Sequence, residues 1–384
     1  MLWKRGWGIG LGLGLLWCLT VPAGSALAPE PAESPAATQD LRLKNTVAPG
    51  GAYTLGVPIQ WELTWTKAPN GRGPSELKLT APGEPWPEYV TITVLHFAEA
   101  HRTPERYLFD LLHAQSDRKD DARTTLKDVV AGGRPAKFLE AAANRYPPLG
   151  MAGDKVPSII RHVIVPASQG FFVLRYDVPE RLDPVHREMF DRAVESFAPG
   201  DRNIPVAQDQ IPAREYDVYA ALFGVRPPSG LDAPQFFDGV PECRQVAGST
   251  MTRDKPLDPG WPGKDFGVLD PGLVKDYLAK NRKVWQLTDR IMVPDLTVIP
   301  AEELEARLSA GFRNPAGREE GADLLREGII TLTRVGFNGT GDLALLGAAL
   351  TYPGTMRARY IVLMKKREAA WDLVKVAMEG LMYQ

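Results

Sequence analysis

Short apolar stretches separated by polar and turn-forming residues fill the first half of the chain. They are rich in β-branched and aromatic residues, which favours β-strands. The predicted strands cover Ile59–Trp65, Glu76–Thr80, Glu88–Phe97, Thr125–Val130, Lys137–Ala142, Ile159–Val165 and Phe171–Val178. Ala167-Ser168-Gln169-Gly170 predicts a hairpin turn between the last two strands. Consecutive strands of this kind indicate an antiparallel sheet.

Two segments of the same half have the spacing of amphipathic helices. Thr103 and Pro104 suit the N-cap and the first turn of a helix. Its apolar face would consist of Tyr107, Leu108, Leu111 and Leu112, and that of a closing helix of Met189, Phe190, Ala193, Val194 and Phe197. Strands covered by such helices favour an α+β fold, in which an antiparallel sheet is flanked by helices.

The second half begins with predicted helices and ends with predicted strands. The helices are Arg214–Phe223, Leu273–Asn281 and Ala301–Ala310. The strands are Ile329–Phe337, Leu343–Leu350, Ala358–Met364 and Trp371–Met378, with turns at Asn338-Gly339, Pro353-Gly354 and Lys365–Glu368. Leu343–Leu350 is apolar on both alternations, which predicts a central strand buried on both faces. We expect helices packed on a four-strand antiparallel meander.

The length of 384 residues indicates two domains. The segment Ala198–Pro212 contains Pro199, Gly200, Asp201, Pro205 and Pro212 without apolar periodicity, and it predicts a linker at residues 200–213. The first α+β domain would then span residues 41–199 and the second residues 214–384. Residues 29–40 have the Pro, Ala, Glu and Ser content of a flexible lead.

Residues 1–28 have the composition of a signal peptide for export. Lys4 and Arg5 precede an apolar run that is shorter than a membrane-spanning helix, and Ala26-Leu27-Ala28 offers a cleavage pattern. Cleavage after Ala26 or after Ala28 would give a secreted or periplasmic protein without a membrane span. The alternative is an uncleaved segment that anchors the protein, because Pro29 is a poor residue at a cleavage site.

The stretch VPASQGFFVLRYDVP followed by HREMFDRAVESFAP resembles the end of the PsbP/DcrB-like domain. The resemblance covers about residues 41–199, and it implies a non-enzymatic role outside the cytoplasm, in assembly or binding. The phrases ITLTRVGFN and ARYIVLMKKREAAWDLVKV resemble the end of an uncharacterised C-terminal domain of exported bacterial proteins. That second resemblance implies no activity.

Charge and cysteine content narrow the possible partners. The chain has 45 basic and 47 acidic residues, so it lacks the basic excess that nucleic-acid binding requires. Cys18 lies within the predicted signal, which leaves Cys243 as the single thiol of an exported chain and excludes an internal disulfide. We expect an envelope protein partner or a small ligand, and no nucleic acid.

No residue set predicts a catalytic centre, a metal site or a cofactor. All five histidines precede the linker, and His96 and His101 lack acidic or thiol ligands at a suitable spacing. Cys243 has no histidine in its own domain to activate it. The acidic residues are scattered, and Asp270, Asp276 and Asp289 lie among basic residues, which predicts a solvated face.

The long Pro- and Gly-rich segment Leu231–Gly267 is a candidate recognition loop. Trp261 and Phe266 are its candidate binding residues, because a Trp is costly to leave in water. The alternative is that Trp261 folds back over its own sheet. We expect an exported envelope protein that acts as a non-enzymatic binding or assembly module, through this loop or through the face between the domains. A hydrolase with carboxylates in an interdomain cleft and a purely structural protein are the alternatives.

Overall fold

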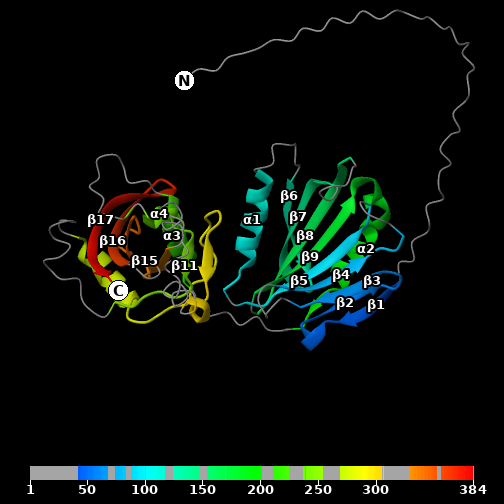
Figure 1. Cartoon of the computed structure of the whole chain (residues 1–384), viewed down its shortest axis with the longest axis horizontal. Coiled ribbons are helices and arrows are strands. Elements are labelled where there is room, and N and C mark those ends of the chain that lie inside the picture. The colour runs from blue at the N-terminus through cyan, green and yellow to red at the C-terminus, as the bar shows by residue number, and fades with distance from the viewer. Residues whose placement is uncertain are drawn as a thin grey trace, which may run out of the picture. The chain divides into compact units, whose positions relative to one another are not determined.

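The computed structural model describes residues 42–67, 74–83, 88–99, 101–116, 124–146, 154–168, 170–200, 211–224, 237, 239–253, 269–304, 306, 328–352 and 356–383. Figure 1 shows two groups of strands with helices packed on them. The buried apolar side chains form two main cores, one within residues 48–197 and one within residues 211–376. Residues 201–210 of the predicted linker lie outside the described residues, so the domain boundary stays a prediction.

The first group of strands is a seven-stranded antiparallel sheet with the order β3-β4-β5-β9-β8-β7-β6. Its strands are β3 (Glu62–Thr66), β4 (Ser75–Thr80), β5 (Thr91–Phe97), β6 (Thr124–Ala131), β7 (Arg134–Arg145), β8 (Val156–Pro166) and β9 (Phe171–Pro179). All seven predicted strands are present. The turn before β9 needs a glycine, since Gly170 has a φ of 66° and a Cβ there would lie 1.7 Å from the Phe97 carbonyl oxygen.

A helix lies on each face of this sheet. Helix α1 (Pro104–Ser116) packs Tyr107 and Leu108 against Phe97, Ile164, Phe171 and Val173. Helix α2 (Asp183–Ser196), which follows the short η3 (Glu180–Leu182), places Met189, Phe190 and Ala193 in the core of the other face. The predicted sheet flanked by helices is therefore confirmed.

A second, three-stranded sheet was not predicted. It has the order β1-β2-β10 and consists of β1 (Leu43–Val47), β2 (Tyr53–Pro58) and β10 (Ala198–Pro199), with η1 (Pro49–Gly51) between the first two strands. Strand β2 packs on α2 and places Tyr53, Leu55 and Val57 in the same core. Segments from both ends of the first half, β1 and β2 at its start and α2 and β10 at its end, thus cover one face of the large sheet.

The second group of strands also forms a seven-stranded sheet. Its order is β12-β11-β13-β15-β16-β17, and β14 pairs with β15. The strands are β11 (Gln245–Ala247), β12 (Thr297–Ile299), β13 (Ile329–Leu332), β14 (Gly336–Phe337), β15 (Leu343–Tyr352), β16 (Met356–Arg367) and β17 (Ala370–Tyr383). The predicted meander is present, and β15 is central and buried on both faces.

Three details of the second half differ from the sequence predictions. The expected strand Ile329–Phe337 is divided into β13 and β14, because Arg334 between them takes part in a buried ion pair. Strands β11 and β12 extend the meander by parallel pairing. The expected loop Leu231–Gly267 contains β11 and α4 (Gly239–Glu242), since Val240, Cys243 and Val246 enter the core.

Helices cover both faces of this sheet. Helix α3 (Ala213–Gly224) packs Tyr219 and Leu222 into the main core. Helix α6 (Pro271–Lys280) places Leu273 and Tyr277 on the opposite face, against Leu345, Ile361 and Leu363. A further helical turn is described at residues 301–304, within the predicted helix Ala301–Ala310.

A buried ion pair ties α3 to the break between β13 and β14. The Glu215 carboxylate has no exposed surface and accepts two hydrogen bonds of 2.7 Å from the Arg334 guanidinium. The Val335 backbone N–H donates a third at 3.0 Å, and the Lys280 ammonium lies 3.6 Å away. The indole ring of Trp285 lies 4.3 Å from the guanidinium carbon of Arg334. Both charges are therefore compensated inside the core.

Replacing Arg334 with Met leaves the Glu215 carboxylate buried without its main partner, and we expect the free energy of unfolding to fall by about 3 kcal/mol. Urea unfolding measures it. The matched control is Arg192→Met, which removes an exposed ion pair on α2 and should cost less than about 1 kcal/mol. An Arg334→Met variant as stable as the control would contradict this account.

Candidate functional site

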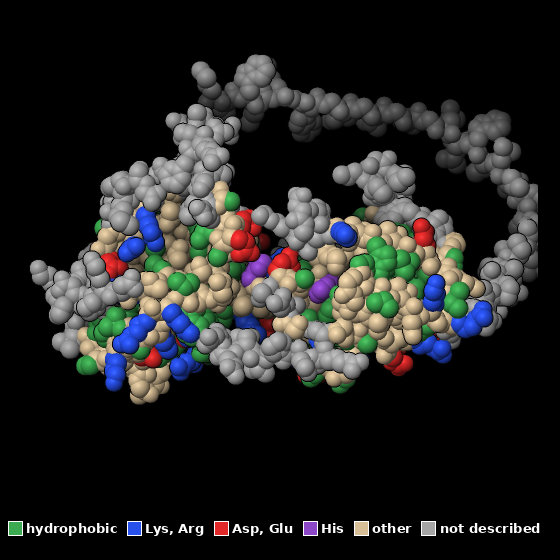
Figure 2. Space-filling view, turned by 90° about the horizontal axis from the view of Figure 1, so that it is seen from below, with side chains coloured by type: hydrophobic (Ala, Val, Ile, Leu, Met, Phe, Trp, Pro, Cys, Tyr) green, Lys and Arg blue, Asp and Glu red, His purple; other side chains and the backbone are tan. Residues whose placement is uncertain are grey.

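A pocket with polar walls lies between α1 and the segment 289–298. It has a volume of about 560 Å³. Its lining residues are His101, Arg102, Arg106, Asp110, His113, Ala114, Asp289, Asp295, Leu296, Thr297 and Val298. In the space-filling view, histidine, acidic and basic side chains gather near the middle of the visible face (Figure 2). The pocket joins residues from both sides of the predicted linker.

The N-terminus of α1 forms one wall, and its sequence explains its position. Thr103 caps the helix as predicted, because its hydroxyl oxygen accepts a hydrogen bond from the Arg106 backbone N–H at 3.4 Å. The same hydroxyl donates to the Asp289 carboxylate at 2.6 Å, and both residues are buried. The Thr103 side chain thus caps α1 and also holds Asp289 in the opposite wall of the pocket.

Asp289 is the buried carboxylate of the pocket, with 6% of its surface exposed. Its backbone N–H donates to the His101 carbonyl oxygen at 2.9 Å, and the Arg102 guanidinium lies 3.7 Å from its second oxygen. Burial raises the pKa of Asp289 to about 6, although the hydrogen bond from Thr103 and the charges of Arg102 and Arg106 oppose this change. Asp289 therefore exchanges its proton in a mildly acidic range.

Arg106 holds the segment 289–298 through its main chain. Its guanidinium donates to the carbonyl oxygens of Ile291 at 2.8 Å and Val293 at 2.9 Å, and its Nε donates to Asp110 at 3.1 Å. The side chain is 6% exposed. Arg106 therefore joins α1 to this segment and shapes the pocket between them.

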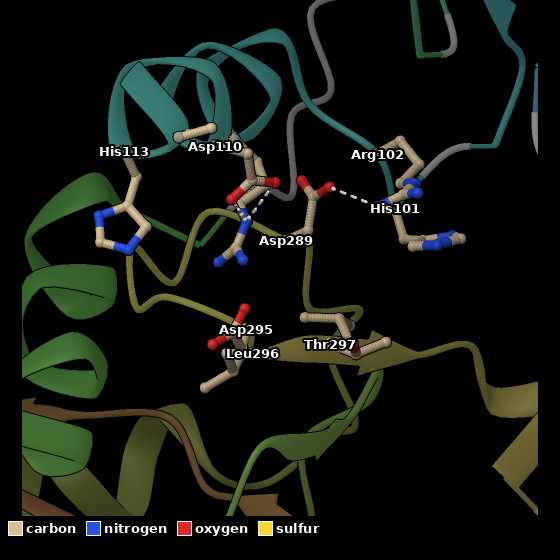
Figure 3. Close-up of a pocket in the computed structure, with 11 residues that line it drawn as sticks. His101, Arg102, Asp110, His113, Asp289, Asp295, Leu296 and Thr297 are labelled. Carbon is tan, nitrogen blue, oxygen red and sulfur yellow. Dashed lines mark hydrogen bonds and ion pairs between the residues drawn. The ribbon is translucent and has the colours of Figure 1, made fainter. Parts of the chain in front are cut away.

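The accessible charged groups stand at the two sides of the pocket. Figure 3 shows His101 and Arg102 on one side and His113 and Asp295 on the other, with Asp289 between them in this view. The side chains of Arg102 and Asp110 are 43% and 51% exposed, and His113 and Asp295 are exposed as well. Burial and the charge of Arg102 lower the pKa of His101, which keeps this ring neutral at pH 7. Groups of both charges can thus reach a ligand.

A smaller cavity of about 300 Å³ adjoins this pocket on the side of the first sheet. Phe97, Tyr107 and Phe171 give it apolar walls, and it shares Arg102, Arg106, Asp110 and Asp289 with the larger pocket. The four charged residues therefore separate a polar space from an apolar one. A ligand with an apolar portion could extend into the smaller cavity.

Sequence reasoning missed this site almost entirely. The candidate residues Trp261 and Phe266 lie outside the described residues, so their binding role stays a prediction. The solvated face expected for Asp289 is wrong, because Thr103 and the loop before α1 cover its carboxylate. Asp270 is exposed, as predicted, and it caps α6 by accepting hydrogen bonds from the backbone N–H groups of Gly272 and Leu273.

The histidine and cysteine considered as candidate site residues pack within the fold. His96 stacks on the ring of Phe172, with 4.4 Å between the ring centres. Cys243 is buried and donates to the Gly328 carbonyl oxygen at 2.7 Å, and burial raises the pKa of its thiol to about 11. Among the described residues, no group of three or more His, Cys, Asp or Glu side chains is arranged to hold a metal ion.

One weak signal could have led to the pocket. Thr103 was predicted as a helix cap, and His101, Arg102, Arg106 and Asp110 cluster around it along the chain. Their partner segment 289–298 lies almost two hundred residues further on and is neither a helix nor a strand over most of its length. Without an alignment or a contact in space, nothing links the two segments.

The raised pKa of Asp289 predicts a pH-dependent stability. Because this pKa lies above its ordinary value of 3.8, the folded protein binds the proton more tightly than the unfolded chain does. The contribution to stability is therefore complete below about pH 4 and is lost as the pH rises through about 6. We expect the stability of the wild type to fall relative to Asp289→Asn over this range by roughly 2 to 3 kcal/mol.

Urea unfolding at a series of pH values measures this difference. The control is Asp191→Asn, because this carboxylate is exposed on α2 and should leave the pH dependence of the wild type unchanged. Parallel curves for the wild type and Asp289→Asn would show that the Asp289 carboxylate does not titrate in this range.

Comparisons with known proteins do not establish a family for this chain. No family model matches it, and no curated protein matches it. It is similar to the crystal structure of LpqN, a protein involved in cell envelope biogenesis of Mycobacterium tuberculosis, with 13% identity and a TM-score of 0.26 over 41% of this chain and 84% of LpqN. At these values the similarity carries no conclusion about function.

Two further structures are similar at the same level. One comes from Bacteroides thetaiotaomicron, with 11% identity and a TM-score of 0.27 over 47% of this chain and 60% of the other. The other is the solution structure of PsbP (CyanoP) from Synechocystis sp. PCC 6803, with 12% identity and a TM-score of 0.27 over 44% of this chain and 99% of the other. A PsbP protein is thus among the similar structures. The resemblance of the C-terminal part to an uncharacterised domain stays a prediction.

Proposed function

We propose that this chain is an exported, non-enzymatic binding module of the bacterial cell envelope, and that it binds a small polar ligand in the pocket between α1 and the segment 289–298. The observation that carries the proposal is the pocket itself. Its two walls are joined by the Thr103–Asp289 hydrogen bond and by the bonds from Arg106 to two carbonyl oxygens. Walls held in this way need little reorganisation when a ligand binds.

The charges at the pocket favour a ligand with both an acidic and a basic group. Arg102 is exposed, and its guanidinium lies 3.7 Å from the Asp289 carboxylate, so it can turn toward the carboxylate of a ligand. Asp295 is an exposed carboxylate that suits an ammonium group, whereas Asp110 is exposed but already pairs with Arg106. Amino acids and short peptides carry both groups, and a dipeptide fits within 560 Å³.

Export is supported by the composition of residues 1–28, which lie outside the described residues. The charged start, the short apolar run and Ala26-Leu27-Ala28 are the features that a signal peptidase recognises. Within the described residues, no helix has the length and apolar character needed to cross a membrane.

A carboxylate-dependent hydrolase is the second candidate, and one observation favours it. Asp289 has a pKa raised to about 6, and His101 nearby has a lowered pKa, as general acids and bases in active sites often do. Against this role, Asp289 is 6% exposed and its carboxylate is occupied by Thr103 and Arg102. Catalysis would require these contacts to open.

A ligand screen tests the binding proposal. We expect members of a panel of free amino acids and dipeptides to raise the unfolding temperature of the full chain. The Kd of the best one, measured by isothermal titration calorimetry, should rise about tenfold or more in Arg102→Gln, because a charge-assisted hydrogen bond is lost. Arg187→Gln on α2 is the matched control and should bind like the wild type.

The same panel distinguishes binding from hydrolysis. We expect the dipeptides to be recovered intact after prolonged incubation, with no difference between the wild type and Asp289→Asn. Release of amino acids by the wild type and not by Asp289→Asn would favour the hydrolase. Absence of any binding would reject the proposed ligand class.

Cell fractionation of the native host tests export. We expect the mature protein outside the cytoplasm, with an N-terminus at Leu27 or Pro29, depending on which alanine precedes the cleaved bond. N-terminal sequencing of the purified protein decides between these positions. Full-length protein in the cytosolic fraction would overturn the proposal, and full-length protein in the membrane fraction would favour the uncleaved anchor.

A further inference from the structure

The second sheet has a charged region on the face that α6 partly covers. Even-numbered residues of β16, such as Tyr360 and Val362, enter the main core. Odd-numbered residues point to the other face, where Ile361 and Leu363 lie under α6. Arg357 and Arg359 continue this row toward the start of the strand, so two arginines occupy positions where a sheet normally presents apolar side chains.

No described residue neutralises the positive charge of Arg357 or Arg359. Both are half-buried, and the Nε atom of each is buried without a hydrogen-bond partner. No carboxylate among the described residues forms an ion pair with either one. Burial and the neighbouring charge of Arg359 lower the pKa of Arg357. Two like charges that are partly removed from water repel one another, and a bound anion would relieve this repulsion.

The carboxylate of Glu379 on β17 binds a third arginine. Glu379 lies at a bulge of β17, next to Gly380, which pairs with Arg359. Its carboxylate is bound by both terminal nitrogens of Arg253, one of them at 3.0 Å. Glu379 therefore neutralises Arg253, and the two positive charges of Arg357 and Arg359 remain.

Small neighbours leave space beside these two side chains. Arg359 is flanked by Ala349 on β15 and by Gly380 on β17. A Cβ atom added to Gly380 would meet no atom within 4 Å, so the space beside Arg359 is open on that side. Thr351, the neighbour of Arg357 on β15, could add a hydroxyl donor.

We propose that Arg357 and Arg359 form a binding site for a phosphate group on this face of the C-terminal sheet. Two residues apart on one strand, their Cα atoms are about 7 Å apart, which allows two guanidinium groups to converge on one anion. The fork of N–H donors on each guanidinium matches phosphate oxygens. A dianionic phosphate monoester compensates both charges, whereas a single carboxylate compensates one. The phosphate belongs either to a small soluble molecule or to a lipid headgroup.

Calorimetry with inorganic phosphate tests this site on the full chain, with chloride at equal ionic strength as the reference. We expect saturable binding by the wild type, and a Kd that is about tenfold or more higher in Arg357→Met and in Arg359→Met. Arg357→Lys keeps the positive charge but loses the fork of N–H donors, so its Kd should lie between those of the wild type and Arg357→Met. Arg187→Met on α2 should bind like the wild type.

Thermal unfolding without phosphate separates a binding role from a structural one. Met keeps most of the apolar stem and removes the uncompensated charge, so Arg357→Met should unfold at the same temperature as the wild type or higher. A variant that unfolds at a lower temperature and still binds phosphate as tightly would show that Arg357 serves the fold. Absence of saturable phosphate binding by the wild type, or equal Kd values in all variants, would overturn the proposal.

Vesicles identify the source of the phosphate once calorimetry shows binding. Co-sedimentation with phosphatidylcholine vesicles that contain phosphatidic acid, and not with phosphatidylcholine alone, supports the lipid headgroup if Arg357→Met abolishes it. Binding of inorganic phosphate without co-sedimentation supports a soluble phosphate. Both outcomes retain the site, and co-sedimentation that is equal in the wild type and Arg357→Met argues against it.

Discussion

The hydrogen bonds from Arg106 to the carbonyl oxygens of Ile291 and Val293 are the contact on which the pocket depends. They attach an irregular segment to α1, and this segment leads directly into β12, which pairs with β11 at the edge of the second sheet. Carbonyl acceptors make the contact independent of the side chains at positions 291 and 293. The helix that covers the first sheet therefore also positions one edge of the second.

The charges at three places in the protein differ in how completely other residues of the chain neutralise them. Glu215 and Arg334 satisfy one another within the core, so their charges support the fold without needing a ligand. Asp289 is satisfied in part, because Thr103 is close and Arg102 is distant. Arg357 and Arg359 have no counter-ion in the described part of the chain. Charge that the chain leaves uncompensated indicates where a ligand can bind.

The sequence predicts most regular elements, since their signals are local. The strands of the first sheet, α1 with its Thr103 cap and the closing meander follow from β-branched runs and helical spacing. Strands β11 and β12 are three residues long and take their structure from parallel neighbours far along the chain. The burial of Asp289 depends on Thr103, which is 186 positions away. Contacts of this range leave no periodic pattern, so the pocket could not be predicted.

The geometry around Asp289 bears on the proposed binding role more directly than its raised pKa does. A general acid needs an oxygen that can reach a substrate, and burial alone also raises the pKa of a carboxylate that only supports a wall. One oxygen of Asp289 accepts from the Thr103 hydroxyl at 2.6 Å, while its backbone N–H is bound to the His101 carbonyl oxygen. The residue is thus held at both its side chain and its main chain. The groups free to meet a ligand are the exposed ones, Arg102 and Asp295, and they offer charge complementarity rather than a proton held near neutral pH.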